Sequence, residues 1–140
     1  MAMRIFLDAN VLIDVVLNRV DFVEASSKVL QLGLDNDCEL WASDVTFVTV
    51  SFYTKKHRTI EQLYHVMSEL RSIVNVVSTG SAAIDWALQQ GNRDFEDTVQ
   101  YYAATHCDAK YIITRNERDS PYTDIPAISP TTFLQIMNAD

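Results

Sequence analysis

The residues best suited to chemistry in this sequence are oxygen-bearing side chains that follow short apolar runs. Asp8 ends one such run, and Asn116 and Asp119 follow another. Carboxylate and amide oxygens are the ligands that Mg²⁺ and Mn²⁺ prefer, whereas Zn²⁺ is more often held by nitrogen and sulfur. A divalent ion on oxygen ligands orients water and helps to deprotonate it for attack on a phosphodiester. These residues therefore predict a site for Mg²⁺ or Mn²⁺ that supports hydrolysis.

A further acidic group opens the helix predicted over residues 94–106. Asp94, Asp97 and Tyr101 are spaced i, i+3 and i+7, which places them on one face of that helix. Acidic residues in a first turn also interact favourably with the helix dipole, and Asp94 suits the N-cap position. Capping does not require two carboxylates on one face, so Asp97 and Asp94 are candidates for the same site as Asp8.

Asp8 also has a simpler interpretation, as a turn or cap residue with no role in chemistry. Asn10 lies at the start of the next predicted helix, and we expect it to cap that helix and so to fix the loop that carries Asp8. The position of Asp8 relative to the other acidic residues therefore decides between the two interpretations.

Short apolar runs alternate with segments of helical periodicity along the chain, which predicts a parallel sheet covered by helices on both faces. Strands are expected over residues 4–7, 39–42, 73–77, 110–114 and 125–128, and helices over 10–17, 22–34, 45–55, 59–71, 81–90, 94–106 and 131–138. Ligands of such folds bind at the carboxyl ends of the strands. We expect each candidate group to follow a different strand, so that all of them open on one edge.

Composition indicates the broad class of protein. The chain has 140 residues, of which 48% are hydrophobic and 21% charged, and this predicts one folded domain over residues 1–140. Cys38 and Cys107 are too far apart in sequence to suggest a disulfide framework, no apolar run approaches a membrane span, and the N-terminus does not resemble a signal peptide. We therefore expect a soluble, cytoplasmic protein with no membrane partner.

The net charge of −8 argues against nucleic-acid binding by charge alone and is explained by solubility or by a metal-binding cluster.

Several segments resemble the PIN domain, the nuclease domain of the VapC toxins of bacterial toxin–antitoxin pairs. The matching segments occur in the family's order and are 6–12, 42–46, 94–100 and 112–116, with 128–130 and 133–134 as the closing part. The resemblance covers essentially the whole chain. It implies a three-layer α/β/α sandwich with a central parallel sheet and a Mg²⁺- or Mn²⁺-dependent endoribonuclease. It further implies an RNA substrate, a small antitoxin partner protein and a homodimer.

The same resemblance implies roles for individual residues. It makes Asp8 and Asp97 metal ligands or catalytic acids, adds Asn116 or Asp119 as a further ligand, and places Asp94 nearby in a catalytic or supporting role. The sequence departs from the family at Thr49, because the family usually has Glu three residues after the Thr that matches Thr46.

The departure at Thr49 leaves alternatives open. A threonine supplies no carboxylate, so we expect weaker metal binding unless Asp94 or Asp44 substitutes. A catalytically weakened PIN-like module that binds RNA or protein is the main alternative. An aspartyl-phosphate phosphatase with Asp8 as nucleophile is less favoured, because Asn10 stands where that chemistry needs a second Asp. The basic run over 55–58 suits either a helix C-terminus or contacts with RNA phosphates beside the acidic pocket.

Overall fold

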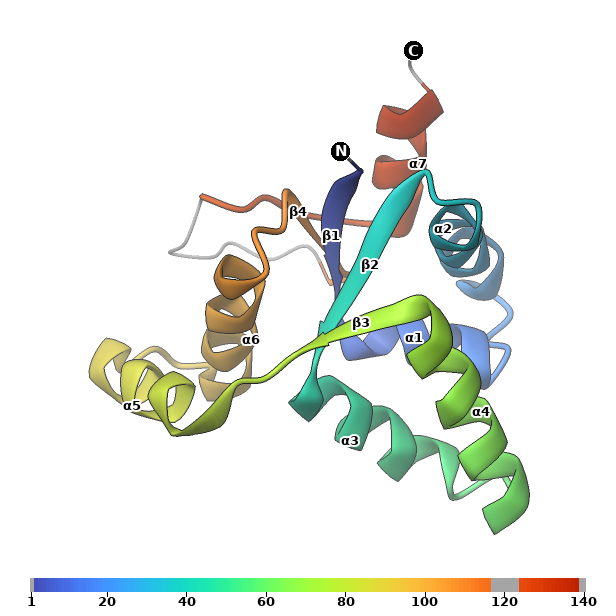
Figure 1. Ribbon diagram of the computed structural model, residues 1–140, viewed down its shortest axis with the longest axis horizontal. Coiled ribbons are helices and arrows are strands. Elements are labelled where there is room, and N and C mark those ends of the chain that lie inside the picture. Colours follow the sequence, from blue (N-terminus) through green and yellow to red (C-terminus); the bar gives the residue numbers. More distant parts are fainter. Residues whose placement is uncertain (1, 117–123, 139–140) are drawn as a thin grey trace.

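The computed structural model describes residues 2–116 and 124–138, and its centre is a parallel β-sheet (Figure 1). The sheet has five strands in the order β3-β2-β1-β4-β5, and every neighbouring pair is parallel. The strands are β1 (Met3–Leu7), β2 (Cys38–Ser43), β3 (Val74–Val77), β4 (Tyr111–Ile113) and β5 (Ala127–Ile128). Because β1 is central and pairs with β4, the carboxyl ends of these two strands lie side by side.

Helices cover both faces of the sheet, which confirms the predicted three-layer α/β/α sandwich. The helices on one side are α1 (Ala9–Val16), α2 (Val23–Leu34), α3 (Asp44–Thr54), α4 (Ile60–Ile73) and α7 (Pro130–Asn138). On the other side, α6 (Phe95–His106) packs on the sheet and α5 (Gly80–Gln90) packs on α6 (Figure 1). Among the helices that the structure describes, none has the length and apolar character needed to cross a membrane.

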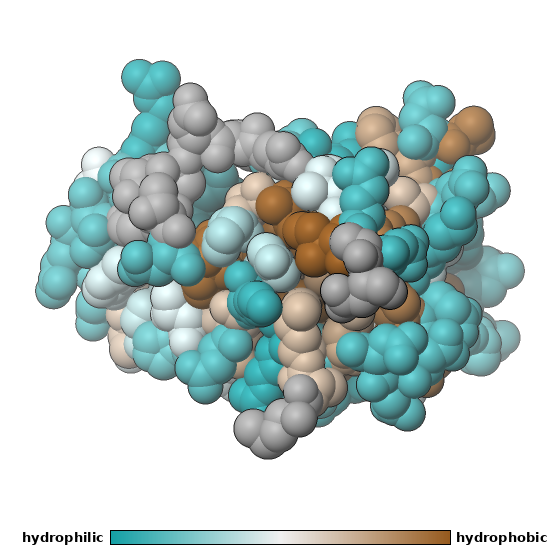
Figure 2. Space-filling view, turned by 90° about the horizontal axis from the view of Figure 1, so that it is seen from above, coloured by the Kyte–Doolittle hydropathy of each residue, from teal (hydrophilic) through white to brown (hydrophobic). Residues whose placement is uncertain are grey.

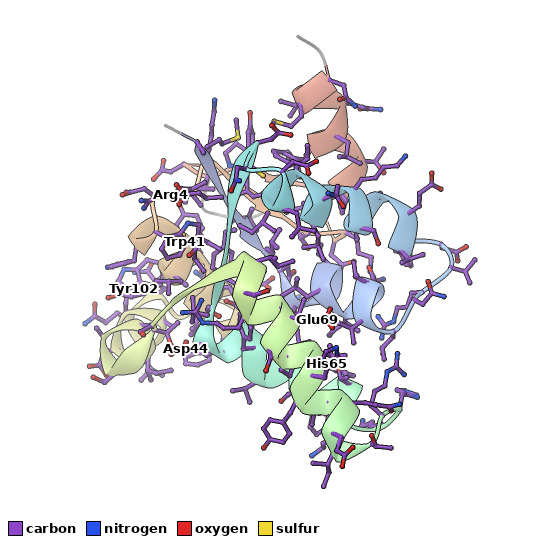
Figure 3. All side chains as sticks on the ribbon, turned by 45° about the vertical axis from the view of Figure 1, so that its right-hand side comes forward. Arg4, Trp41, Asp44, His65, Glu69 and Tyr102 are labelled. Atoms are coloured by element: carbon purple, nitrogen blue, oxygen red, sulfur yellow. The ribbon has the colours of Figure 1, made fainter. Side chains whose placement is uncertain are left out.

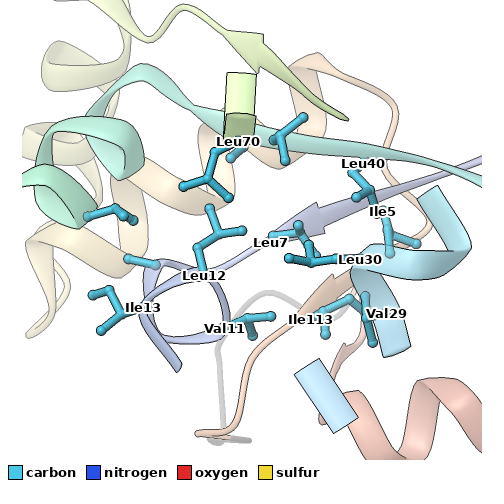
Figure 4. Close-up of a cluster of buried hydrophobic side chains, with 14 of the residues drawn as sticks. Ile5, Leu7, Val11, Leu12, Ile13, Val29, Leu30, Leu40, Leu70 and Ile113 are labelled. Atoms are coloured by element: carbon cyan, nitrogen blue, oxygen red, sulfur yellow. The ribbon is translucent and has the colours of Figure 1, made fainter. Parts of the chain in front are cut away.

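The last three residues of β1, Ile5, Phe6 and Leu7, are apolar and buried, because both faces of the strand are covered there. Ile5 and Leu7 point into the larger hydrophobic cluster, which α1, α2 and α7 close from outside (Figure 4). Phe6 points to the opposite face, where it meets Ala103 and Ala104 of α6. Burying a side chain of this size stabilises the fold by about 1.5–3 kcal/mol. The two packed faces therefore hold β1, and the residue that follows it, rigidly in place.

The predicted elements agree with the structure to within a few residues, and local signals explain where several of them begin or end. Thr59 and Gln62 form a capping box at the start of α4. Gly91 ends α5 in a left-handed conformation with φ of 62°, as glycine readily does. Strand β5 is shorter than the predicted 125–128 because Pro126 has no amide hydrogen to donate to the sheet.

The outer surface is more polar than the interior, as the charge content of the sequence requires. Figure 2 shows the molecule from above, with a largely hydrophilic rim and hydrophobic residues toward the middle of that view.

Candidate active site

Asp8 lies directly after β1 and is oriented by side chains from two other parts of the chain. Its backbone amide donates to the carbonyl of Ile113 at 2.9 Å, so the pairing of β1 with β4 continues through it. Its carboxylate oxygen Oδ2 accepts hydrogen bonds from Thr114 Oγ1 at 2.8 Å and from Asn10 Nδ2 at 3.3 Å. Asp8 occupies the N-cap position of α1, but its side chain makes no cap hydrogen bond. The carboxylate is therefore held in place without being used to cap the helix.

The prediction that Asn10 caps α1 is wrong. Asp8 has the extended backbone of an N-cap, with φ −70° and ψ 153°, so Asn10 falls inside the first turn of the helix. Its side-chain amide instead bridges Asp8 and Thr114, with Nδ2 3.3 Å from each acceptor oxygen. Asn10 thus supports the loop from within the helix rather than from its end.

Asn116 is brought to the same edge by the segment that follows β4. Its backbone amide donates to Thr114 Oγ1 at 3.2 Å, and the backbone amide of Arg115 donates to Asn10 Oδ1 at 3.4 Å. The buried Thr114 is therefore the common partner of Asp8, Asn10 and Asn116. Sequence reasoning passed over Thr114, although its position directly after a buried strand was a usable signal. The fourth predicted ligand, Asp119, lies outside the described residues.

Asp94 and Asp97 reach this edge by a different route from the one predicted. They do not follow a strand, because α5 stands between β3 and α6. The close packing of α6 against the sheet, through the small residues Ala103 and Ala104, brings the start of the helix to the carboxyl edge instead.

The two aspartates at the start of α6 occupy different positions. Asp94 is the N-cap, and its Oδ1 accepts a hydrogen bond from the backbone amide of Asp97 at 2.9 Å. Asp97 is exposed and lines the pocket at the carboxyl edge, whereas Asp94 is not among the described residues that line it. Of the two carboxylates on this helix face, that of Asp94 therefore caps the helix and that of Asp97 lines the pocket.

Asp8, Asp97 and Asn116 line one pocket of about 80 Å³ at the carboxyl edge. Asp8 is half-buried, while Asp97 and Asn116 are exposed, so an ion or a phosphate from solvent can reach all of them. The other described lining residues are mostly apolar and are Phe6, Gln100, Tyr101, Ile112, Thr114 and Ala127. Side-chain oxygens that could bind a metal ion therefore lie at the mouth of a pocket whose floor is the packed face of the sheet.

A buried hydrogen-bond cluster joins α3 to Gln100, a residue of α6 that lines the pocket. Gln100 Nε2 donates to Thr46 Oγ1 at 2.8 Å, and Ser43 Oγ donates to Gln100 Oε1 at 2.7 Å. Ser43 is also the N-cap of α3, since its Oγ accepts from the Thr46 amide at 3.0 Å. Hydrogen-bonded polar groups at a buried position rigidify their surroundings. Sequence reasoning did not single out Gln100, which looked like an ordinary helical residue.

Thr49 uses its hydroxyl within its own helix. Its Oγ1 donates to the Val45 carbonyl at 3.0 Å, and Thr49 is not among the described residues that line the pocket. Asp44 lies at the start of α3 (Figure 3). Its Oδ1 accepts a hydrogen bond from Thr79 Oγ1 at 3.0 Å. Within the described residues, neither Asp44 nor Asp94 lines the pocket in place of the Glu that the family usually has.

The donor set suits a hard divalent ion. The described part of the chain contains no cluster of three or more His, Cys, Asp or Glu side chains arranged for a metal. Mg²⁺ is commonly held by only one or two carboxylates and keeps several water ligands or substrate oxygens. Asp8 and Asp97, with the Asn116 amide oxygen, fit that requirement.

The basic run over 55–58 is not beside the pocket. The run follows the last residue of α3, and α3 begins at the carboxyl end of β2, so the length of the helix, about 16 Å, separates them. Arg58 donates to the Val16 carbonyl at 2.9 Å, and Lys56 Nζ lies 4.4 Å from the centroid of the Phe52 ring. These contacts tie the run to the far ends of α1 and α3.

Known proteins resemble this chain over most of its length. The PIN domain family model matches residues 4–118. Ribonuclease VapC1 from Aquifex aeolicus (strain VF5) is 25% identical in an alignment 140 residues long that covers 96% of this chain and 96% of that protein. The VapBC2 structure from Rickettsia felis bound to a promoter DNA fragment matches with a TM-score of 0.66 and 14% identity, over 89% of this chain and 97% of that one. A toxin–antitoxin complex from Klebsiella pneumoniae matches with a TM-score of 0.61 and 19% identity, over 89% and 96% of the two chains.

Proposed function

The chain belongs to the PIN domain family, and on that premise we propose that it is a metal-dependent endoribonuclease and the toxin of a toxin–antitoxin pair. The observation that carries the proposal is the convergence of Asp8, Asp97 and Asn116 in one pocket at the carboxyl edge of the sheet. The similarity to a protein named ribonuclease supports the same activity.

In this proposal Asp8 and Asp97 hold Mg²⁺ or Mn²⁺, and Asn116 or Asp119 adds a further oxygen. When bound, such an ion lowers the pKa of water and neutralises charge on the phosphodiester. Thr114 and Asn10 keep the Asp8 carboxylate oriented toward the pocket through their hydrogen bonds to Oδ2. Asp94 fixes the start of α6, and so the position of Asp97, by accepting the Asp97 amide hydrogen.

The charge of the protein gives the ion a second role. At a net charge of −8, the protein repels a polyanion such as RNA at long range. A divalent cation between Asp8 and Asp97 supplies the local positive charge that a phosphate group needs. We therefore expect RNA to depend on the metal for productive binding as well as for cleavage.

An antitoxin protein and a second copy of the chain are the proposed partners. The structural matches from Rickettsia felis and Klebsiella pneumoniae are toxin–antitoxin complexes, and this supports a similar assembly here. Purification of the chain together with the product of the neighbouring gene tests the antitoxin. Light scattering of the purified chain tests the homodimer.

A catalytically weakened PIN-like module that binds RNA or protein is the second candidate function. It is favoured by Thr49, because the hydroxyl that replaces the family's usual carboxylate is bound to the backbone of its own helix. Such a module keeps the fold but binds the ion too weakly for efficient hydrolysis.

A metal titration combined with a cleavage assay separates the candidate functions. Calorimetry with Mn²⁺ and cleavage of total RNA are measured on the parent chain and on Asp8→Asn. The nuclease binds Mn²⁺ and cleaves RNA, and Asp8→Asn loses both properties. A parent chain that shows neither metal binding nor cleavage at millimolar Mn²⁺ contradicts the nuclease and favours the binding module.

A further inference from the structure

Asp14 is a fully buried carboxylate that the proposed chemistry does not use. It lies on α1, and 0% of its surface is exposed. Its Oδ2 accepts from Arg115 Nε at 2.8 Å, and its Oδ1 accepts from Arg19 Nη1 at 3.4 Å. It is not among the described residues that line the pocket, so it does not contact an ion held there.

Stability alone does not explain this arrangement. Burial raises the pKa of Asp14 above its ordinary value, even though the guanidiniums of Arg115 and Arg19 act in the opposite direction. Replacing a buried ion pair with apolar side chains of similar volume is often neutral or stabilising. A charged group kept at such a position is better explained by the geometry that it imposes on its partner.

The partner, Arg115, belongs to the segment that carries two residues of the pocket. Thr114 precedes it and donates to the Asp8 carboxylate, and Asn116 follows it. The backbone amide of Arg115 donates to Asn10, while its guanidinium carbon lies 4.2 Å from the centroid of the Phe22 ring. The backbone contact at 3.4 Å is long for a hydrogen bond, whereas the side-chain contact with Asp14 at 2.8 Å is short and charge-assisted.

Segment 114–116 is thus tied to α1 at successive residues. Thr114 binds Asp8, the Arg115 amide faces Asn10, and the Arg115 side chain binds Asp14. Since Asp8 and Asp14 lie at opposite ends of one rigid helix, these contacts set both the distance and the rotation of the segment relative to α1. The Asp14 contact reaches the last turn of α1, about 9 Å along the helix axis from Asp8, so together with the Asp8 contact it restrains rotation of the segment.

We propose that Asp14 is a positioning residue for the metal site, which acts by fixing Arg115 and through it the orientation of Thr114 and Asn116. This inference rests on the proposed function, because it assumes that Asp8 and Asn116 hold a divalent ion. It predicts that the ion pair can be replaced without loss of the fold but not without loss of metal affinity.

The test compares the parent with the double variant Asp14→Leu/Arg115→Met. Leucine fills the buried position of Asp14, and methionine keeps an apolar stem against Phe22, while Arg19 is exposed enough to turn to solvent. We expect a midpoint of unfolding close to that of the parent, but affinity for Mn²⁺ weakened about tenfold or more, as for other residues that orient metal ligands. Exchange of the backbone amides of residues 115 and 116 should also become faster in the metal-free double variant, with exchange in β1 unchanged.

Arg19→Met is the matched control, because it removes a guanidinium from the same carboxylate without touching segment 114–116. Its affinity for Mn²⁺ should stay within about twofold of the parent, a difference of less than 0.5 kcal/mol. An equal loss of affinity in Arg19→Met overturns the proposal, because the effect then follows the charge around Asp14 rather than the segment. If the double variant does not fold, Arg115→Lys gives the same measurements, since it keeps a cation but lacks the Nε–H group.

Other results of these measurements would contradict either the positioning role of Asp14 or the proposed function. A folded double variant with the parent's metal affinity, or with unchanged amide exchange at residues 115 and 116, overturns the positioning role alone. A parent chain that binds no Mn²⁺ overturns the proposed function and the assignment of a metal site. In that case the exchange measurement still decides whether Asp14 fixes the segment.

Discussion

Two hollows lie at opposite ends of the sheet and differ in size and chemistry. The one at the carboxyl edge has a volume of about 80 Å³ and contains Asp8, Asp97 and Asn116. The other, of about 310 Å³, lies at the amino ends of β2 and β3, where α2 and α4 end. The larger hollow also has polar walls, yet we place no chemistry there.

The polar side chains of the larger hollow are engaged in holding the fold together. Arg71 donates to the Val74 carbonyl and Asn75 to the Leu40 carbonyl, each at 3.2 Å. Glu39 forms an ion pair with Arg4 at 3.4 Å, and Arg4 in turn lies over the Trp41 ring (Figure 3). These contacts join neighbouring elements and do not converge on a common point.

Helix direction explains the rest of the difference. At the carboxyl edge α1 and α3 begin, so their amino ends, which carry partial positive charge, face the region where a phosphate would bind. At the amino edge α2 and α4 end, and their carbonyl groups carry partial negative charge. The smaller hollow is therefore the one suited to an anionic substrate, and size alone is a poor guide.

The strongest test of whether the chemistry lies only in the smaller hollow is to neutralise one carboxylate in each hollow. Asp97→Asn should reduce RNA cleavage by roughly 100-fold or more, since it removes a proposed ligand rather than a residue that orients one. Glu39→Gln removes a carboxylate from the larger hollow and should leave cleavage unchanged. Cleavage of total RNA is measured at a fixed Mn²⁺ concentration, with thermal unfolding as a check of the fold. Equal losses in both variants, or none in Asp97→Asn, would contradict the assignment.

Adding a carboxylate near the same site is the converse test, because it should strengthen metal binding rather than weaken it. Thr49 lies one helical turn after Thr46, whose hydroxyl contacts the pocket residue Gln100. A glutamate at 49 has the length to extend toward the pocket, and Thr49→Glu should tighten Mn²⁺ binding by about tenfold, or about 1.4 kcal/mol. Calorimetric titration measures the change, with Thr49→Gln as the uncharged control. If Thr49→Glu binds no better than Thr49→Gln, residue 49 does not face the site.

Most of the fold was predictable, because its elements are defined by local signals. Continuous apolar runs identify buried strands, and Gly91 and Thr59 mark helix boundaries through backbone preference and capping. Convergence of Asp8 and Asn116 was predictable too, since both follow strands of a parallel sheet. The part that sequence reasoning missed, including Thr114 and Gln100, depends on hydrogen bonds between residues far apart in the chain. The position of Thr114 after a buried strand could have singled it out, but no local pattern identifies the distant partners of either residue.

A smaller effect is expected at Asp94, where capping and metal binding make different predictions. Loss of an N-cap aspartate should lower the free energy of unfolding by about 1 kcal/mol in Asp94→Ala. Thr59→Ala removes the corresponding cap from α4 and serves as the matched control for stability. If Asp94 only caps α6, both variants lose similar stability and both retain cleavage within a few-fold. A loss of cleavage confined to Asp94→Ala, at equal stability, would show that Asp94 also acts on the site, either directly or by fixing the position of Asp97.

The smallest effect is expected at Cys38, which lines the larger hollow but is only 2% exposed. Burial raises the pKa of its thiol to about 11, from a usual value of 9.0, so the native thiol stays neutral at pH 8. Alkylation proceeds through the thiolate, and we therefore expect no measurable adduct with iodoacetamide in the native protein and complete reaction in urea.

The pH dependence of the same thiol gives an independent check. The Cys38 thiol ionises near pH 9 in the unfolded chain and only near pH 11 in the folded chain. Its contribution to stability should therefore be constant below pH 9 and fall as the pH rises through that interval. For the alkylation test, mass spectrometry of tryptic peptides distinguishes Cys38 from Cys107. Cys107 is also buried with a raised pKa and should likewise stay unmodified in the native protein. Rapid labelling of Cys38 alone at pH 8 would mean that the larger hollow opens to solvent around a reactive thiol. The contrast between an inert structural hollow and a chemically active one would then fail at the amino edge of the sheet.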